Sequence, residues 1–271
     1  MSSRITTTIS RLREQGRTAL VPFLTVGDPD LQTSRDAILA VAEAGGDILE
    51  LGIPFSDPIA DGPVIQESSQ RALAAGCSLP RVLEMVAWLR QRTDTPFILF
   101  GYYNPFFRYG DEALARDAAA AGADGILCTD LPPEEAGPLA GACRRHGLDR
   151  IFLLAPTSNE ERMHAVAQYA SGFVYMVSVT GVTGAREAAP AAGIHDLVRR
   201  TRAIIDLPIG VGFGISTPEQ AASVAAYADL VIVGSALVRR VHEGGAAAAR
   251  EFISSLRAGI DGAAANAEKP R

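Results

Sequence analysis

The sequence is almost free of lysine. Of the 25 basic residues in this chain of 271, Lys269 near the C-terminus is the one lysine, and the rest are arginines. A Schiff base requires a lysine amine at the reacting centre. The body of the chain therefore cannot act as a lysine-dependent aldolase or hold pyridoxal phosphate covalently.

Cysteine is scarce too, and basic charge does not dominate. Cys77, Cys128 and Cys143 are odd in number and widely spaced, which excludes a disulfide framework and favours a reducing, cytoplasmic compartment. The net charge is −6, whereas binding to the backbone of nucleic acid needs a basic surface. No histidine falls at the end of a predicted strand, so we predict no metal site.

Long hydrophobic runs are also absent. No segment approaches the roughly 18 apolar residues of a membrane span, so no membrane association is predicted. The N-terminal segment 1–17 lacks the apolar centre of a secretory signal, although its Arg, Ser and Thr content leaves an organelle transit peptide as an alternative. The spacing of Ile5, Ile9 and Leu12 favours a short amphipathic helix.

Short apolar runs alternate with helical patterns along the whole chain. We expect strands at Ala19–Val26, Asp47–Ile53, Phe97–Gly101, Gly125–Thr129, Ile151–Leu154, Phe173–Val179, Ile209–Gly212 and Leu230–Val233. Runs that are apolar on both faces are typical of buried parallel strands. Eight strand–helix units in this length predict an α/β protein with a single (β/α)8 TIM barrel, and an open doubly wound sheet is the alternative.

Further features complete the predicted organisation. We expect an extra N-terminal helix, and a short extra helix after the eighth strand. The segment 54–76 is expected to be a long loop after the second strand, before the next helix. We predict one domain over residues 1–271, with a small, polar tail from about 261 that frays.

Carboxylates fall where a barrel places its active site, at the carboxyl ends of the strands. Glu50 interrupts the apolar run Ile48–Ile53. A buried carboxylate is costly unless it is paired or its pKa is raised, and a raised pKa suits acid/base catalysis. A structural glutamate bonded to the backbone is the alternative. Asp57 and Asp61 follow in a proline-stiffened loop that could fold over the same pocket or form ordinary solvated turns.

Glycine-rich turns follow the last three predicted strands. They are Thr180–Gly184, Gly212–Ser216 and Gly234–Ala236, and the last of them opens a helix. Such turns let backbone N–H groups approach phosphate oxygens without a lysine. Apolar residues expected at the mouth indicate a flat apolar substrate, although each could be ordinary core: Phe23, Phe100, Leu127, Tyr175 and Phe213.

Together these motifs resemble one family, the α subunit of tryptophan synthase. The stretch Glu50–Pro58, continued by Ala60–Pro63, resembles its signature nearly residue for residue, and Gly181–Gly184, Gly212–Ser216 and Gly234–Ser235 match its pattern. The resemblance covers essentially the whole chain. It implies retro-aldol cleavage of indole-3-glycerol phosphate to indole and glyceraldehyde 3-phosphate, without a cofactor in this chain.

The resemblance also implies roles for individual residues. Glu50 becomes the main acid/base, and Asp61 binds the indole N–H. The phosphate is held by Gly184, Gly214, Gly234 and Ser235, and the pocket is lined by Phe23, Tyr175, Thr183 and Phe213. A β subunit carrying pyridoxal phosphate completes an α2β2 heterotetramer. Four residues in top-face loops could face this partner or be simple exposed turns: Asp57, Asn104, Pro105 and Pro132.

Three other functions remain open at this point. A free-standing indole-3-glycerol phosphate lyase would carry the same two carboxylates and release indole without a partner. A non-catalytic regulatory barrel would only activate a partner enzyme, and the presence of both Glu50 and Asp61 argues against it. Other phosphate-binding barrels share the glycine turns.

Overall fold

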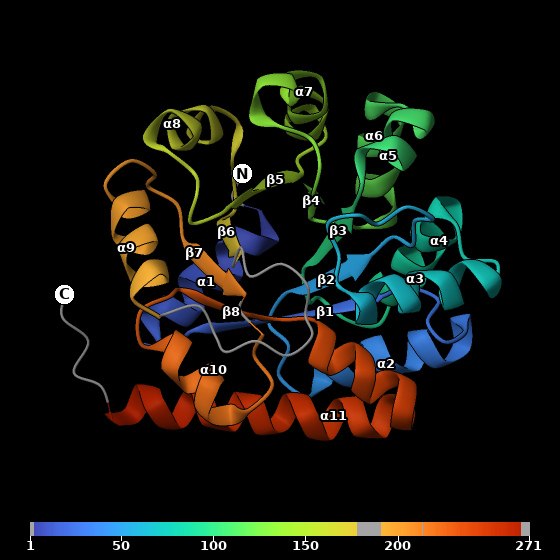
Figure 1. The fold of residues 1–271 in the computed structure, drawn as a ribbon. Helices are drawn as coiled ribbons and strands as arrows, with labels where there is room; N and C mark the ends of the chain where they lie inside the picture. The colour runs from blue at the N-terminus through green and yellow to red at the C-terminus, as the bar shows by residue number, and fades with distance from the viewer. Residues whose placement is uncertain (1–2, 178–190, 213, 267–271) are drawn as a thin grey trace.

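A closed parallel barrel forms the centre of the molecule (Figure 1). The computed structural model describes residues 3–177, 191–212 and 214–266. The strands pair in chain order, and β8 pairs with β1. They are β1 (Ala19–Thr25), β2 (Leu49–Gly52), β3 (Phe97–Gly101), β4 (Gly125–Cys128), β5 (Asp149–Leu154), β6 (Val174–Val177), β7 (Ile209–Gly212) and β8 (Leu230–Val233). This closure confirms the predicted barrel and excludes the open sheet.

Helices surround the strands, and the first of these helices covers one end of the barrel (Figure 1). They are α1 (Arg4–Glu14), α2 (Leu31–Glu43), α3 (Pro63–Ala74), α4 (Leu79–Arg90), α5 (Tyr103–Tyr109), α6 (Asp111–Ala121), the 3-10 helix η1 (Pro133–Glu135), α7 (Gly137–Arg145), α8 (Glu160–Tyr169), α9 (Ala191–Arg202), α10 (Pro218–Ala225) and α11 (Ser235–Asn266). No single helix among those described is long and apolar enough to cross a membrane. The helices α3 and α4 reach that length and apolar character only together, and they are bent by 92° relative to each other.

Two of these helices correct the expectation from sequence. α3 occupies much of the segment 54–76, where the sequence predicts a loop. Pro63 is its first residue, a position where proline sacrifices no hydrogen bond because the first N–H groups of a helix have no partner in it. Pro105 likewise lies in the first turn of α5. Asn104 and Pro105, which the sequence places in a loop, therefore lie on a helix.

The last helix, α11, is bent near its middle. Its backbone leaves helical geometry at Gly244 and Gly245, and Gly245 has a φ of 58°, a value that glycine adopts readily. The part before the bend corresponds to the short extra helix predicted after the eighth strand. The part after it continues to Asn266. The start of the tail predicted to fray is thus helical, because alanine strongly favours helix.

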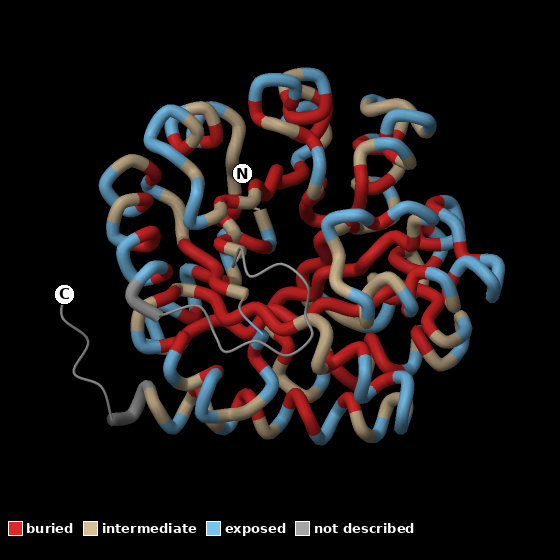
Figure 2. The backbone as a smooth tube through the Cα atoms, in the orientation of Figure 1, coloured by how far each residue is buried: buried red, intermediate tan, exposed pale blue. Residues whose placement is uncertain are grey.

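The core has an outer and an inner part, separated by the sheet. The outer part packs the strands against the helices, and most strand residues are buried (Figure 2). The inner part fills the barrel and includes Ala19, Val21, Ile48, Ile98, Leu127, Ile151, Phe173, Leu230 and Ile232. Ile5, Ile9 and Leu12 of α1 belong to this inner part, as their spacing predicts. The barrel is therefore packed solid at the end that α1 covers.

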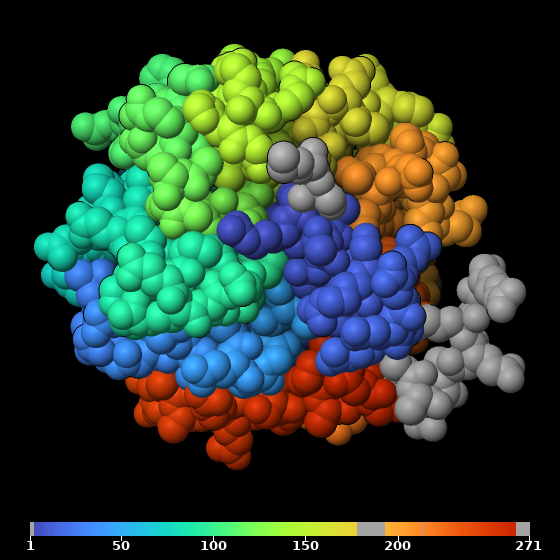
Figure 3. Space-filling view, turned by 180° about the vertical axis from the view of Figure 1, so that it is seen from behind, coloured from blue at the N-terminus to red at the C-terminus, as the bar shows by residue number. Residues whose placement is uncertain are grey.

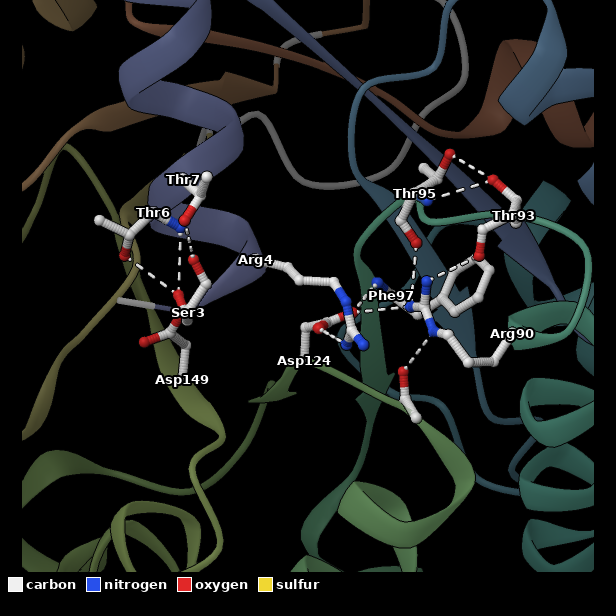
Figure 4. Close-up of polar contacts among 11 residues, drawn as sticks. Ser3, Arg4, Thr6, Thr7, Arg90, Thr93, Thr95, Phe97, Asp124 and Asp149 are labelled. Carbon is white, nitrogen blue, oxygen red and sulfur yellow. Dashed lines mark hydrogen bonds and ion pairs between the residues drawn. The ribbon is translucent and has the colours of Figure 1, made fainter. Parts of the chain in front are cut away.

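Helix α1 lies across the rear face of the molecule, where it closes the barrel (Figure 3). Polar contacts fasten it to the amino-terminal ends of two strands (Figure 4). Arg4 is paired with Asp124 at 2.7 Å, and the Ser3 hydroxyl donates a hydrogen bond to Asp149. Asp124 also pairs with Arg90 at 2.9 Å and accepts the backbone N–H of Phe97 at 2.8 Å. The closed end is thus held by both apolar and charged contacts.

We predict that Ile5→Ala lowers the free energy of unfolding by about 3 kcal/mol, because it leaves a cavity under α1. Ile5 is 0% exposed. Urea unfolding followed by circular dichroism measures the change. Ser10→Ala, on the exposed face of the same helix, is the control and should alter stability by less than about 0.5 kcal/mol. Equal stability of the two variants would contradict a structural role for α1.

Candidate active site

A cavity of about 590 Å³ opens at the carboxyl-terminal ends of the strands. The residues around it come from both sides of the barrel and from α11. They include Phe23, Glu50, Asp61, Ile65, Phe100, Tyr175, Gly212, Gly214, Ser216, Ile232, Gly234, Ser235, Arg239 and Arg240. Barrel enzymes bind their substrates at this end. The structure therefore brings many of the predicted site residues into one pocket.

Glu50 is the buried acid of this cavity. It lies on β2 beside Phe23 of β1 and Ile98 of β3, and its residue is 1% exposed. Neither carboxyl oxygen has a hydrogen-bond partner. Burial raises the pKa of Glu50 from 4.5 to about 8. The group is therefore mostly protonated at neutral pH, yet it releases its proton close enough to that pH to serve as both acid and base.

Asp61 is the second carboxyl group and has a different environment. It follows β2 in the loop before α3 and is only partly buried. Burial raises its pKa to about 6, and a hydrogen bond from the Tyr102 hydroxyl, 3.0 Å from Oδ2, works in the opposite direction. At neutral pH Asp61 is mostly ionised beside a mostly protonated Glu50. Such a separation of pKa values is typical of acid/base pairs in active sites.

Tyr102 is a residue that the sequence analysis missed. It directly follows β3, is 3% exposed and holds two neighbours in the loop after β2. Its hydroxyl accepts the backbone N–H of Ala60 at 3.0 Å and donates to Asp61. The ring of Phe55 packs on it with centroids 5.3 Å apart. Its position at the carboxyl end of a strand was the available signal.

Aromatic rings form one wall of the cavity. Phe23 and Phe100 meet edge to face, with centroids 5.0 Å apart and planes at 75°. Two glycines make room for the rings. A Cβ at Gly52 would lie 2.5 Å from Phe23 Cζ, and one at Gly212 would lie 2.4 Å from the Tyr175 hydroxyl oxygen. Larger residues at these glycines would therefore displace the rings.

The place of three further residues in the pocket stays a prediction. Leu127 is fully buried in the inner core, and it pairs in register with Phe100, which lines the cavity. Thr183 and Phe213 lie outside the described residues.

Glycines and a helix start also line the cavity. Gly214 follows β7 with a φ of +53°, and Gly234 directly precedes α11. Ser235 begins that helix, whose first N–H groups have no partners within it. Gly184, the fourth predicted phosphate residue, lies outside the described part of the chain.

Two exposed arginines on α11, Arg239 and Arg240, also line the cavity and were not predicted. The Arg239 Nε lies 3.5 Å from the carbonyl oxygen of Ser235, so this side chain runs back over the first turn of the helix. Their place one turn after the Gly234–Ser235 motif was the available signal. They bring positive charge to the side of the cavity where the glycine turns lie.

The residues predicted to face a partner lie after three neighbouring strands. Asp57 is exposed after β2, Asn104 and Pro105 lie on α5 after β3, and Pro132 is half-buried after β4. Exposed apolar side chains accompany them. Ile59 is 87% exposed in the first segment, and Phe107 on α5 is 67% exposed. The sequence analysis named neither as a site residue.

No group of three or more His, Cys, Asp or Glu side chains in the described ranges is arranged to hold a metal ion. Cys128 is buried, and burial raises the pKa of its thiol to about 12. A thiol of this kind is a poor nucleophile at neutral pH. Carboxyl groups are thus the reactive side chains that this geometry offers.

Comparisons with known proteins agree on one family. The family profile described as tryptophan synthase alpha chain matches residues 9–264. The tryptophan synthase alpha chain of Geobacter sulfurreducens is 55% identical over 95% of this chain and 99% of its own length, and that of Geotalea uraniireducens is 53% identical over 95% and 98%. The tryptophan synthase subunit alpha of Legionella pneumophila is similar in structure, with a TM-score of 0.91, 40% identity and coverage of 97% and 100%. A Mycobacterium tuberculosis tryptophan synthase is similar too, with a TM-score of 0.90 and 42% identity over 96% of this chain and 99% of the other.

We predict that Glu50→Gln makes the protein more stable than the wild type at alkaline pH. The folded protein keeps Glu50 protonated, whereas the unfolded chain ionises it above pH 4.5. The stability of the wild type therefore falls as pH rises from about 4.5 to 8, by at most on the order of 3–5 kcal/mol. A neutral glutamine removes this loss.

Urea unfolding of both proteins at pH 5 and pH 9 measures the effect, and the difference between them should grow with pH. The exposed Glu84→Gln on α4 is the control for a change of charge at the surface. A constant difference would mean that Glu50 is ionised in the folded protein.

Proposed function

The chain belongs to the tryptophan synthase alpha chain family, and on this premise we propose how its cavity performs the carbon–carbon lyase reaction of that enzyme. The substrate is indole-3-glycerol phosphate, which is cleaved to indole and glyceraldehyde 3-phosphate. One observation carries the mechanism. Glu50, a buried carboxyl group without a partner, shares the cavity with a more acidic carboxyl group, Asp61.

In the proposed reaction Glu50 donates one proton and then accepts another. Protonated Glu50 first gives its proton to C3 of the indole ring, which makes the ring an electron sink. The resulting carboxylate then takes the proton of the side-chain hydroxyl, the carbon–carbon bond to C3 breaks, and its electrons return to the ring. Indole and an aldehyde leave, and Glu50 is again protonated. A pKa near 8 suits a group that must do both steps.

Asp61 stabilises the charge that this reaction creates. Protonation at C3 places positive charge on the indole nitrogen. An ionised carboxylate that accepts a hydrogen bond from the indole N–H group stabilises this charge. Its pKa of about 6 keeps Asp61 ionised at neutral pH. The rings of Phe23, Phe100 and Tyr175 supply an apolar wall for the flat indole.

The phosphate site lies on the glycine side of the cavity. We propose that Gly214 after β7, and Gly234 and Ser235 at the start of α11, bind the phosphate through backbone N–H groups. By resemblance, Gly184 joins them and Thr183 lines the pocket. Arg239 and Arg240 add positive charge nearby. The site therefore needs no lysine.

The partner is the tryptophan synthase β subunit. We propose that it docks where Asp57, Asn104, Pro105 and Pro132 lie, and that the exposed side chains of Ile59 and Phe107 are covered there. Pyridoxal phosphate then belongs to the β subunit, and this chain acts as one cofactor-free domain in the cytoplasm within an α2β2 assembly. Exposed apolar groups at this face favour a partnered subunit over a free-standing lyase.

We predict that Glu50→Gln and Asp61→Asn each lower indole release by more than about 100-fold while the fold survives, because both changes are isosteric. The assay follows indole after addition of indole-3-glycerol phosphate, with and without a β subunit, beside circular dichroism of each variant. Unchanged rates would support a regulatory barrel. If indole release is fast without the β subunit and does not become faster when this subunit is added, the result would support a free-standing lyase.

We predict that Arg239→Gln raises the KM for indole-3-glycerol phosphate about two- to tenfold and leaves kcat unchanged, because an exposed charge attracts the phosphate equally in the ground and transition states. The effect should shrink at high salt, which screens charges. Arg250→Gln is the control, since Arg250 lies on the same helix but pairs with Glu43 away from the cavity. Equal KM values for the two variants would contradict this role.

A further inference from the structure

Tyr102 stands where two segments of the proposed partner face meet the active site. It directly follows β3 and caps the start of α5, so its backbone is continuous with the helix that carries Phe107. Its ring packs against Phe55 and its hydroxyl binds the amide of Ala60, the residue next to the exposed Ile59. One residue therefore joins both segments, because its backbone leads into α5 and its side chain contacts the loop after β2.

The same hydroxyl reaches the active site through Asp61. It donates a hydrogen bond to Asp61 Oδ2 at 3.0 Å. Tyr102 itself is not among the residues that line the substrate cavity, whereas Asp61 is. Tyr102 thus reaches that cavity through the carboxylate to which it donates.

The start of α5 is fixed from a third side. Asp130, in the segment after β4, accepts the backbone N–H of Tyr103 at 2.7 Å. Pro132, a third element of the proposed partner face, follows in the same segment. A shift of any of these segments would therefore act on the backbone at Tyr102.

We propose that Tyr102 is a positioning residue that joins the loop after β2 and the start of α5 to Asp61, so that docking of a β subunit on these segments changes how Asp61 is held. The inference rests on the proposed function of Asp61 and of this face. The proposed role belongs to the hydroxyl group of Tyr102. The substitution Tyr102→Phe removes this group and keeps the ring.

The direction of the effect follows from the hydrogen bond. Donation to a carboxylate favours its ionised form, so loss of the donor raises the pKa of Asp61 above about 6. The other titratable or charged groups that face Asp61 or line the same cavity are Glu50 on β2, Tyr175 on β6, and Arg239, Arg240 and Glu243 on α11. The substitution leaves all of these in place.

The experiment measures kcat/KM for indole release against pH in wild type, Tyr102→Phe and Tyr103→Phe. Tyr103 is the matched control, because it is the next tyrosine and its hydroxyl binds Asp111 instead. For Tyr102→Phe the acid limb should move up by about one pH unit. The rate should fall about fivefold at pH 6 and little at pH 8. Tyr103→Phe should follow the wild type.

Two further measurements separate positioning from structure. In an Asp61→Asn background, Tyr102→Phe should change the residual rate less than about twofold, since the group it acts on is gone. Stimulation of indole release by an added β subunit should be about threefold smaller in Tyr102→Phe than in Tyr103→Phe. Equal losses at all pH values, or the same loss in both backgrounds, would overturn the inference.

Its failure is distinguishable from failure of the proposed function. A wild type that releases no indole would refute the function, whereas identical profiles for the two tyrosine variants would refute only the role of Tyr102. Carbon-13 NMR titration of the Asp61 carboxyl group measures the pKa of Asp61 directly and does not require the enzyme to be active. An unchanged pKa in Tyr102→Phe would overturn the inference even without catalysis.

Discussion

Burial of one carboxyl group, Glu50, is the constraint on which the proposed chemistry depends. The closed barrel surrounds it with apolar neighbours and gives neither oxygen a partner. A carboxylate there would lose its hydration without compensation, so the protonated form persists to about pH 8. A reaction that must both give and take a proton near neutrality needs such a group. The same burial lowers the stability of the folded protein as pH rises, so function and stability oppose each other at this residue.

The barrel separates these opposing demands by placing them at different ends. At the closed end, α1 fills the interior with Ile5, Ile9 and Leu12, and Asp124 binds two arginines there. At the open end, glycines replace side chains and leave room for rings and for a substrate. An unpaired group such as the Glu50 carboxyl can be tolerated at the open end, because the packing at the closed end holds the strands in register. This arrangement is the physical reason why barrel enzymes vary one end and preserve the other.

Sequence reasoning reached the barrel because its signals are local. Buried parallel strands are continuous apolar runs, and Glu50 is conspicuous within one of them. The errors concern features that depend on three dimensions. α3 and α5 contain prolines in their first turns, which on sequence alone resemble loops. The contact between Tyr102 and Asp61 joins residues from two different strand ends that no short motif spans.

The scarcity of lysine gains a physical meaning from the geometry. Lysine serves aldol chemistry in two ways, as an electron sink through a Schiff base and as a cation for phosphate. In the proposed mechanism the indole ring takes the first part, once Glu50 protonates it and Asp61 stabilises the charge. In the same proposal the start of α11, with Arg239 and Arg240 one turn later, takes the second. Arginine suits this second part because its planar guanidinium stays protonated and presents several N–H donors that match phosphate oxygens.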